Sequence, residues 1–494
     1  MSLEKEADIC LICEGSYPYR MGGVAQWVNE LIYEHREKTF HILTLVPPNP
    51  DLTMYYKFPQ NVISHTRIIV EDLPKGASSF LMPEKIWEVM GFTFRGLISS
   101  KEFCDFDQIL KFFEQNRDVL GKHILCESKQ FWDFILSLYD QVLPFGPFKS
   151  YFSTIYTLSR SIYSVLLPKL PKAKLFHAVC TGYAGLVLYR AKKELKVPCI
   201  LTEHGIYSNE RRIDIALAKW IVEKEAVDLD LEDKKRTLKD MWLNAFFSFA
   251  YACYTHADEV ICTFDGNQAI QIEGGADPAK VQTIVHGINQ EKYAAIKAKR
   301  TKHLPTVAFV GRVVPIKDVK TFIRACQIIH KKNPEIRFYI LGSLEEDPEY
   351  AQECKNLCNF LEISKCIQFL GSVDLQKYFT EIDLVVLTSI SEAQPLVMLE
   401  AGAVGIPCVA TNVGACDQLI NGSKDERPSL GQGGLVTPLV NPEATAEAIL
   451  RIMGDADFYK TCSETIEKRI HTFYKFDQEH AKYRDLYNKH MNHG

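Results

Sequence analysis

Between residues 307 and 453, short apolar runs alternate regularly with longer amphipathic stretches. The runs predict strands at Val307–Val310, Ile336–Leu341, Ile367–Leu370, Leu384–Leu387 and Cys408–Ala410. The stretches predict helices at Val319–Lys332, Pro348–Leu361, Leu375–Thr380, Leu396–Val404 and Pro442–Met453. Strands that alternate with helices favour a parallel, Rossmann-like sheet. The second half of the chain is therefore expected to be an α/β domain.

The first half carries similar signals with one long interruption. Buried strands are expected at Ala7–Cys13, His41–Val46, Leu175–Val179, Ala257–Thr263 and Val281–Asn289. Residues from about 50 to 165 exceed what a simple strand–helix alternation needs, and their aromatic-rich stretches predict a mostly helical insertion. The polar run Glu291–Lys302 is the best candidate boundary. We therefore expect domains at 1–290 and 291–474, with a final helix over about 475–494.

Composition limits the classes of partner and compartment. The 494 residues carry a net charge of −5, so nothing in the overall charge favours nucleic acid or an anionic membrane. No apolar run approaches the length of a membrane span, and the first residues lack the apolar core of a signal peptide. Most of the 15 cysteines lie in apolar stretches, and Cys10 and Cys13 fall on opposite faces of one strand. Reduced thiols and a cytoplasmic location are expected.

The loop Ser389–Gln394 has the strongest functional signature. It follows the apolar run Leu384–Leu387 and precedes the helix that Pro395 suits as a first residue. Ligands of open α/β sheets bind where strands hand over to helices. Glu392 and Glu400 stand eight residues apart, roughly 12 Å along a helix, and carboxylates accept hydrogen bonds from paired hydroxyls. The pair predicts contacts to the sugar and the ribose of a nucleotide-sugar, although short motifs also occur by chance.

Two cations emerge at another strand end of the same predicted sheet. Arg312 and Lys317 follow the strand Val307–Val310. Arginine offers a bidentate fork and lysine a point charge, which together suit a diphosphate. Solubility is the simpler explanation of two exposed cations, but their place at the ligand edge of the sheet favours diphosphate binding.

The first half contributes two further candidates. Gly22 and Gly23 end a loop between the first strand and a helical stripe, a unit that suits phosphate but also describes a plain tight turn. His204 lies in Thr202-Glu203-His204-Gly205 at the carboxyl end of a strand, the expected ligand edge.

The next residues are less informative. Glu210 and Arg211 could face an acceptor, but a solvated first helical turn is the simpler interpretation. Asp-x-Asp pairs occur at Asp105–Asp107, Asp228–Asp230 and Asp455–Asp457. None of these pairs follows a buried strand, so we expect no metal site.

These motifs, in this order, resemble the retaining family 4 glycosyltransferases, which have the GT-B fold. The resemblance implies an α/β protein with two Rossmann-like domains facing across a cleft. It also implies an acceptor-side domain at 1–290 and a nucleotide-sugar donor domain at 291–474, with the helix from about 475 crossing back.

The same resemblance assigns roles to single residues. His204 and Glu392 would contact the reacting sugar, Arg312 and Lys317 the diphosphate, Glu400 the ribose, and Phe369-Leu370-Gly371 would lie in the base-contacting loop. The donor-binding set further comprises Gly22, Gly23, Ala393, Gln394, Pro395 and Leu396. Ala393 and Gln394 stand where the family commonly has glycine and an aromatic residue.

By this resemblance the chain transfers a hexose or N-acetylhexosamine from a UDP-sugar to a growing exopolysaccharide, without a metal or other cofactor. Within the family it is most similar to the cytosolic enzymes of exopolysaccharide synthesis, which act with inner-membrane partners. No nucleic-acid partner is implied. Two alternatives stay open: a nucleotide-sugar 2-epimerase of the same fold, and a noncatalytic UDP-sugar-binding subunit.

Overall fold

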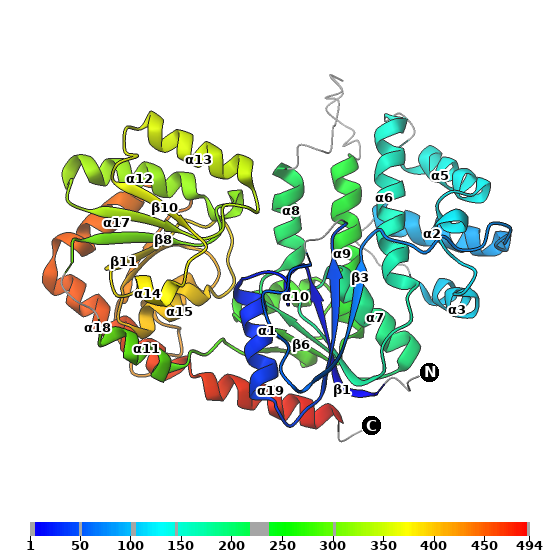
Figure 1. Cartoon of the computed structure of the whole chain (residues 1–494), viewed down its shortest axis with the longest axis horizontal. Coiled ribbons are helices and arrows are strands. Elements are labelled where there is room, and N and C mark those ends of the chain that lie inside the picture. Colours follow the sequence, from blue (N-terminus) through cyan, green and yellow to red (C-terminus); the bar gives the residue numbers. More distant parts are fainter. Residues whose placement is uncertain are drawn as a thin grey trace. The chain divides into compact units, whose positions relative to one another are not determined.

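The computed structural model describes residues 5–48, 52–99, 105–143, 147–217, 237–299 and 303–491. The chain divides into two compact units, shown in Figure 1. The first unit contains Met1–Thr283 and Tyr483–Gly494, and the second contains Ile284–Lys482. We expected the boundary within the polar run Glu291–Lys302, but the division falls earlier, between Thr283 and Ile284. The described start of the polar run forms helix α11, Gln290–Lys297, of the second unit.

The first unit is built on a seven-stranded sheet in which all pairs are parallel and the order is β3-β2-β1-β4-β5-β6-β7. Its strands are β1 Ala7–Glu14, β2 Phe40–Val46, β3 Val62–Ile69, β4 Ala173–Ala178, β5 Cys199–Glu203, β6 Glu259–Cys262 and β7 Val281–Thr283. The last strand is shorter than expected, since residues beyond Thr283 begin the second unit.

Ten α-helices follow or interrupt these strands in the described part of the first unit. They are α1 Gly23–Glu34, α2 Glu84–Ser99, α3 Asp107–Asn116, α4 Lys122–Leu125, α5 Lys129–Val142, α6 Phe148–Leu166, α7 Tyr183–Leu195, α8 Tyr207–Leu217, α9 Leu238–His256 and α10 Gly266–Glu273. A short 3-10 turn covers Pro278–Lys280.

The expected helical insertion corresponds to α2–α6, which share one apolar core with α7, α9 and one face of the sheet. Phe94, Phe134 and Tyr163 join three of these helices by ring contacts of 5.5–5.8 Å. The insertion begins later than expected, because β3 also lies within residues 50–165. This edge strand is polar and half-buried at His65 and Thr66, so it lacks the apolar run that marks the inner strands.

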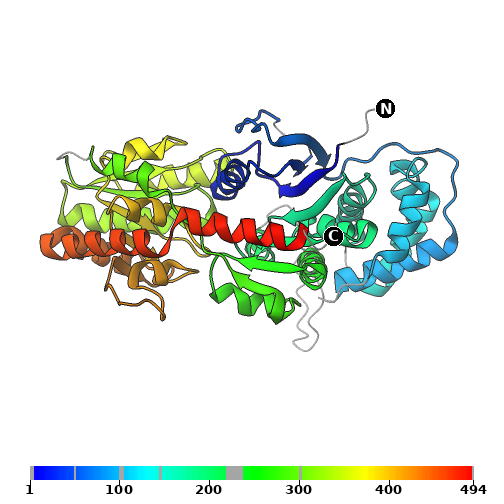
Figure 2. The same cartoon turned by 90° about the horizontal axis from the view of Figure 1, so that it is seen from below.

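The opposite face of this sheet is covered by α1 and by the end of α19, Phe476–Met491 (Figure 2). Trp27 of α1 packs on the ring of Tyr483 at 5.3 Å. The Tyr487 hydroxyl forms a hydrogen bond of 2.8 Å with Nδ1 of buried His177 in β4. Tyr483, Leu486 and Tyr487 of the last helix are therefore part of the core of the first unit.

The second unit is built on a six-stranded parallel sheet with the order β10-β9-β8-β11-β12-β13. Its strands are β8 Thr306–Val310, β9 Arg337–Leu341, β10 Ile367–Gly371, β11 Leu384–Leu387, β12 Cys408–Thr411 and β13 Gly434–Thr437. Besides α11 and the start of α19, its helices are α12 Val319–Lys332, α13 Pro348–Phe360, α14 Leu375–Tyr378, α15 Leu396–Ala403, α16 Cys416–Asn421, α17 Pro442–Gly454 and α18 Ala456–Phe473.

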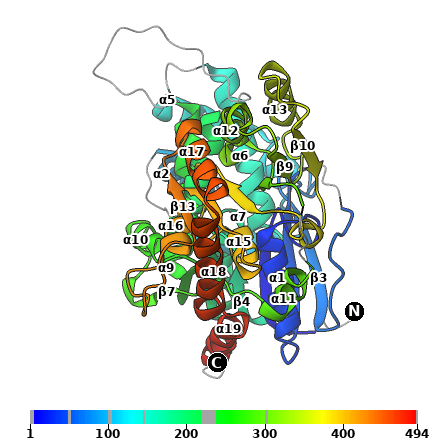
Figure 3. The ribbon, with the colours of Figure 1, turned by 90° about the vertical axis from the view of Figure 1, so that its left-hand side faces the viewer.

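Helices α12, α13 and α17 share a core with one face of this sheet, and α12 and α17 lie together in Figure 3. Strand order reverses direction between β8 and β11, so the loops that follow these two strands flank a topological switch point. The α/β class and the two Rossmann-like sheets expected from the sequence are confirmed. Among the described residues, no helix is both long and apolar enough to cross a membrane.

Candidate functional site

The two loops at the switch point of the second unit are bound to each other. The N–H of Ile390, after β11, donates to the carbonyl of Ile316, after β8, at 2.9 Å. The Thr388 hydroxyl donates to the carbonyls of Lys317 and Asp318 at 3.2 and 2.9 Å. The backbone therefore fixes the residues of one loop against those of the other.

This arrangement brings Lys317 and Glu392 into contact. Lys317 Nζ lies 2.5 Å from Glu392 Oε1, and both side chains are largely buried. Ser389 Oγ donates to the same carboxylate oxygen at 2.7 Å. A cation and a fixed carboxylate thus stand side by side where the sheet topology places a ligand. Such a pair can hold a phosphate oxygen on one side and a sugar hydroxyl on the other.

Arg312, the second expected diphosphate ligand, points to a different partner. Its Nη1 lies 2.7 Å from Glu346 Oε2, in the loop after β9, and its side chain is half exposed. A carboxylate is the protein group most similar to a phosphate, so Glu346 occupies the kind of position that a diphosphate oxygen would take. Both expected phosphate-binding cations are paired with carboxylates of the chain itself.

The segment Ala393–Leu396 is shaped by contacts within the second unit. The Ala393 carbonyl accepts from Ala415 N–H at 2.6 Å, and a side chain at Gly414 would collide with that carbonyl. Ala393 does not adopt a positive φ, so alanine satisfies a position where the family commonly has glycine. Pro395 precedes α15 as its cap residue, and Leu396 is the first helical residue.

Gln394 departs most clearly from the family pattern. Its side chain is buried, and its Oε1 accepts from the N–H of His286 at 2.7 Å. The amide thus ties the loop to the first residues of the second unit, and a contact with the donor stays a prediction.

Glu400 lies in the middle of α15 and is half-buried. Its Oε1 accepts from the hydroxyl of Tyr293 in α11 at 2.9 Å. The contact fixes the carboxylate orientation, as a residue that receives ribose hydroxyls would require. Sequence reasoning did not find Tyr293.

In the first unit, Gly22 and Gly23 lie just before and at the start of α1. Gly22 is exposed, its backbone is extended, and a Cβ atom there would touch nothing within 4 Å. Space around Gly22 is therefore open, which leaves room for a ligand but does not by itself identify one.

His204 follows the last residue of β5, and its ring lies edge-on against Trp27 of α1 with centroids 4.4 Å apart. The Glu210 side chain lies close to Gly205, since a Cβ atom at this position would lie 2.3 Å from Glu210 Oε1. Arg211 forms an ion pair with Asp214 at 3.2 Å and lies over the Tyr207 ring at 5.0 Å. These contacts favour a structural first turn of α8, and an acceptor role for Glu210 and Arg211 stays a prediction.

Two acidic residues that sequence reasoning passed over organise the same sheet edge. Glu14 ends β1 and accepts from the Tyr207 hydroxyl at 2.6 Å and from Ala184 N–H at 2.9 Å. Glu203 ends β5 and is fully buried. In both cases the sequence shows a glutamate directly after an apolar strand. Because glutamate is rarely buried without a partner, this pattern could have indicated a carboxylate with several hydrogen-bond partners.

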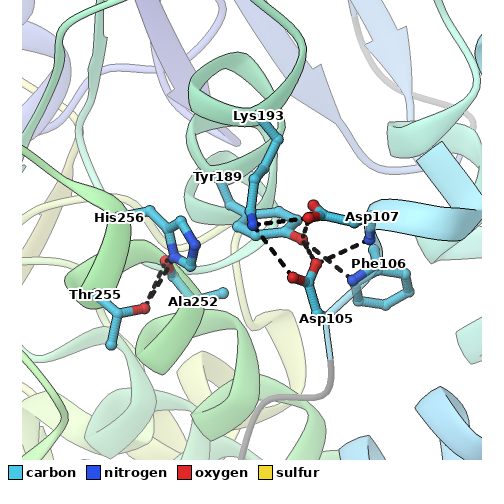
Figure 4. A network of polar contacts seen from close by, with 8 residues as sticks. All are labelled: Asp105, Phe106, Asp107, Tyr189, Lys193, Ala252, Thr255 and His256. Carbon is cyan, nitrogen blue, oxygen red and sulfur yellow. Dashed lines mark hydrogen bonds and ion pairs between the residues drawn. The ribbon is translucent and has the colours of Figure 1, made fainter. Parts of the chain in front are cut away.

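The Asp-x-Asp pair at Asp105–Asp107 belongs to a structural network (Figure 4). Lys193 Nζ lies 3.2 Å from Asp105 and 3.1 Å from Asp107, and the Tyr189 hydroxyl donates to Asp105. The pair thereby joins the start of α3 to α7. Asp455 caps α18 by accepting from Phe458 N–H at 3.0 Å. Asp228–Asp230 lies outside the described residues, and metal independence stays a prediction.

Comparison with known proteins supports the class of protein that these motifs predict. The chain belongs to the family described as "Domain of unknown function (DUF3492)", whose model matches residues 7–279. Residues 304–455, which contain Arg312, Lys317 and both glutamates, match the model described as glycosyl transferases group 1.

Among curated proteins, the chain is 25% identical over 330 residues to UDP-Gal:alpha-D-GlcNAc-diphosphoundecaprenol alpha-1,3-galactosyltransferase of Escherichia coli, covering 63% of this chain and 73% of that protein. It is 27% identical over 223 residues to D-inositol 3-phosphate glycosyltransferase of Corynebacterium urealyticum, covering 41% of this chain. The chain spans only 50% of the length of the latter relative.

Among solved structures, sucrose-phosphate synthase of Thermosynechococcus elongatus aligns with a TM-score of 0.60 at 16% identity, covering 99% of this chain and all of that one. HepE of Anabaena, solved with UDP and glucose, aligns with a TM-score of 0.57 at 14% identity, covering 97% of this chain and 98% of that one. These likenesses confirm the GT-B fold. Together with the match of residues 304–455, they confirm the expected similarity to group 1, family 4-like glycosyltransferases.

Proposed function

We propose that the chain is a retaining, metal-independent glycosyltransferase that takes a hexose or N-acetylhexosamine from a UDP-sugar. The observation that carries the proposal is the contact between Lys317 and Glu392 at the switch point of the second unit. It lies within the segment that matches glycosyl transferases group 1.

The proposed chemistry is electrostatic. As the bond between the anomeric carbon and the diphosphate oxygen breaks, the leaving UDP gains negative charge, which Arg312 and Lys317 stabilise. The sugar gains oxocarbenium character, and Glu392 and His204 hold it. An acceptor hydroxyl forms the new bond from the leaving-group side, and its proton passes to a diphosphate oxygen. Glu400 and Tyr293 hold the ribose.

The proposed acceptor is a growing exopolysaccharide. The opening loop Cys13–Tyr19 with Gly22–Ala25, and the segment Leu201–Tyr207, resemble those of PelF, the cytosolic glycosyltransferase of Pel exopolysaccharide synthesis. By that resemblance the chain acts in the cytoplasm, in biofilm polysaccharide production, with partners at the inner membrane.

The test is an incubation of the full chain with UDP-glucose or UDP-N-acetylglucosamine, followed by measurement of UDP release with and without oligosaccharide acceptors. We expect UDP release from at least one of these two UDP-sugars, and the release should be faster with an acceptor. The product of an α-linked donor should itself be α-linked. Conversion of UDP-N-acetylglucosamine to its 2-epimer without acceptor would favour the epimerase. Binding of UDP without turnover would favour a noncatalytic subunit.

A further inference from the structure

Glu203 is a fully buried carboxylate at the end of β5 that accepts four hydrogen bonds. Its Oε1 accepts from Thr181 Oγ1 and from the N–H of Tyr207, both at 3.0 Å. Its Oε2 accepts from the Tyr254 hydroxyl at 2.6 Å and from Gln271 Nε2 at 3.1 Å. The four donors come from the loop after β4 and from α8, α9 and α10.

Burial of a charge at this position is costly and needs compensation. An ionised carboxylate that leaves water loses several kcal/mol of solvation unless hydrogen bonds replace it. Burial raises the pKa of Glu203, while its hydrogen bonds with Tyr254, Gln271, Tyr207 and Thr181 lower it. On balance the pKa of Glu203 is raised, because burial outweighs these hydrogen bonds. Each carboxylate oxygen nevertheless has one partner that can only donate, the Tyr207 N–H for Oε1 and Gln271 Nε2 for Oε2. If the side chain at this position only filled space, an apolar residue of similar volume would do so without the cost of burying a carboxylate.

The next residue along the chain is the candidate catalytic histidine. Only residues 204–206 separate β5 from α8. Glu203 fixes both ends of this link, since its backbone pairs with Cys262 in the sheet and its carboxylate binds the first N–H of α8. Trp27 packs on one side of His204. The link therefore has little freedom as long as the Glu203 carboxylate is in place.

We propose that Glu203 is a positioning residue, which holds the loop that presents His204 to the reacting sugar. This inference rests on the proposed function. A glutamate that only stabilised the fold would contribute to the melting temperature and leave the turnover of folded enzyme unchanged. A positioning residue changes turnover, because a displacement of about 1 Å at a reacting group can cost roughly 100-fold in rate.

The experiment uses the full chain, with UDP release from UDP-glucose and UDP binding measured separately. Glu203→Gln should lower kcat by about 10- to 100-fold, because its amide group would face two of the four donors. UDP affinity should change by less than about twofold, since Arg312 and Lys317 belong to the other unit. Tyr254→Phe removes one donor and should lower kcat in the same direction by less.

Glu259→Gln is the matched control. Glu259 is a second buried carboxylate of the same sheet, 5% exposed, but it begins β6 and is paired with Lys489 and His490 at the opposite strand ends. The substitution should lower the melting temperature and leave kcat unchanged.

A double-mutant cycle separates positioning from stability. In a His204→Ala background, Glu203→Gln should cause no further fall in kcat, because the group that it positions is gone. Unchanged kcat in both Glu203→Gln and Tyr254→Phe, or full additivity with His204→Ala, would overturn the inference. If Glu203→Gln does not fold, Tyr254→Phe and its own cycle with His204→Ala decide. A wild-type chain that turns over neither UDP-glucose nor UDP-N-acetylglucosamine would instead remove the proposed function.

Discussion

Replacement of Lys317 by Met tests the donor site most sharply among single substitutions. Lys317 Nζ has a carboxylate partner at 2.5 Å and is mostly buried, so it is already placed for a charged ligand. A hydrogen bond to a charged group contributes about 1.5–3 kcal/mol. At about 1.4 kcal/mol per tenfold change, Lys317→Met should weaken UDP binding by roughly 10- to 150-fold.

Calorimetric titration with UDP and with uridine provides the assay. Uridine lacks the diphosphate, so its affinity should change little. Lys320→Met is the matched control, because Lys320 lies three residues further on, with Glu353 at 2.6 Å, on α12 rather than in the loop. Equal losses for UDP and uridine, or an equal loss in Lys320→Met, would show that Lys317 does not hold the diphosphate.

Three further outcomes are expected. Glu400→Gln should weaken UDP and UDP-sugars alike, whereas Glu392→Gln should leave UDP affinity unchanged and lower turnover, measured by calorimetry and UDP release; the reverse pattern would exchange their roles. EDTA should leave the UDP affinity measured by calorimetry unchanged. A loss of UDP affinity in EDTA would refute the proposal that cationic side chains alone bind the diphosphate. Burial lowers the pKa of His177 to about 3, from 6.5 in the unfolded chain, so the unfolded state binds more protons below about pH 6.5. His177 should therefore contribute a fall of roughly 1.4 kcal/mol in the free energy of unfolding between about pH 7.5 and 5.5. Because burial also lowers the pKa of His41 to about 4, the wild-type chain should lose more than this, and in denaturant titrations His177→Gln should reduce the fall by about the share of His177.

Local signals predicted the elements that position the candidate donor site. The helix expected at Val319–Lys332 has these bounds in the structure, because Asp318 caps its first turn through Thr321 N–H and Asn333 ends it. The strand expected at Leu384–Leu387 is equally well placed. Both are inner elements, whose continuous apolar residues are directly visible in a sequence.

Long-range pairings could not be predicted from such signals. Lys317 and Glu392 lie 75 residues apart, and topology predicts their shared edge but not their contact. The partner of Arg312, Glu346, stands in a loop with no distinctive motif. Gln394 binds the His286 backbone, which only tertiary structure brings near. Glu203 went unnoticed because its four partners come from widely separated segments.

The measurement that tests the central claim most directly is a thermal-shift comparison of UDP-glucose, GDP-glucose and ADP-glucose with the wild-type chain and Lys317→Met. A ligand that binds only the folded state raises the melting temperature, and at a fixed ligand concentration the rise is larger for a tighter ligand. The account predicts a clear rise with UDP-glucose, a much smaller rise with the other two nucleotide-sugars, and loss of the rise in Lys317→Met. No shift with any of the three, or the same shift in wild type and variant, would contradict a UDP-sugar site at the switch point of the second unit.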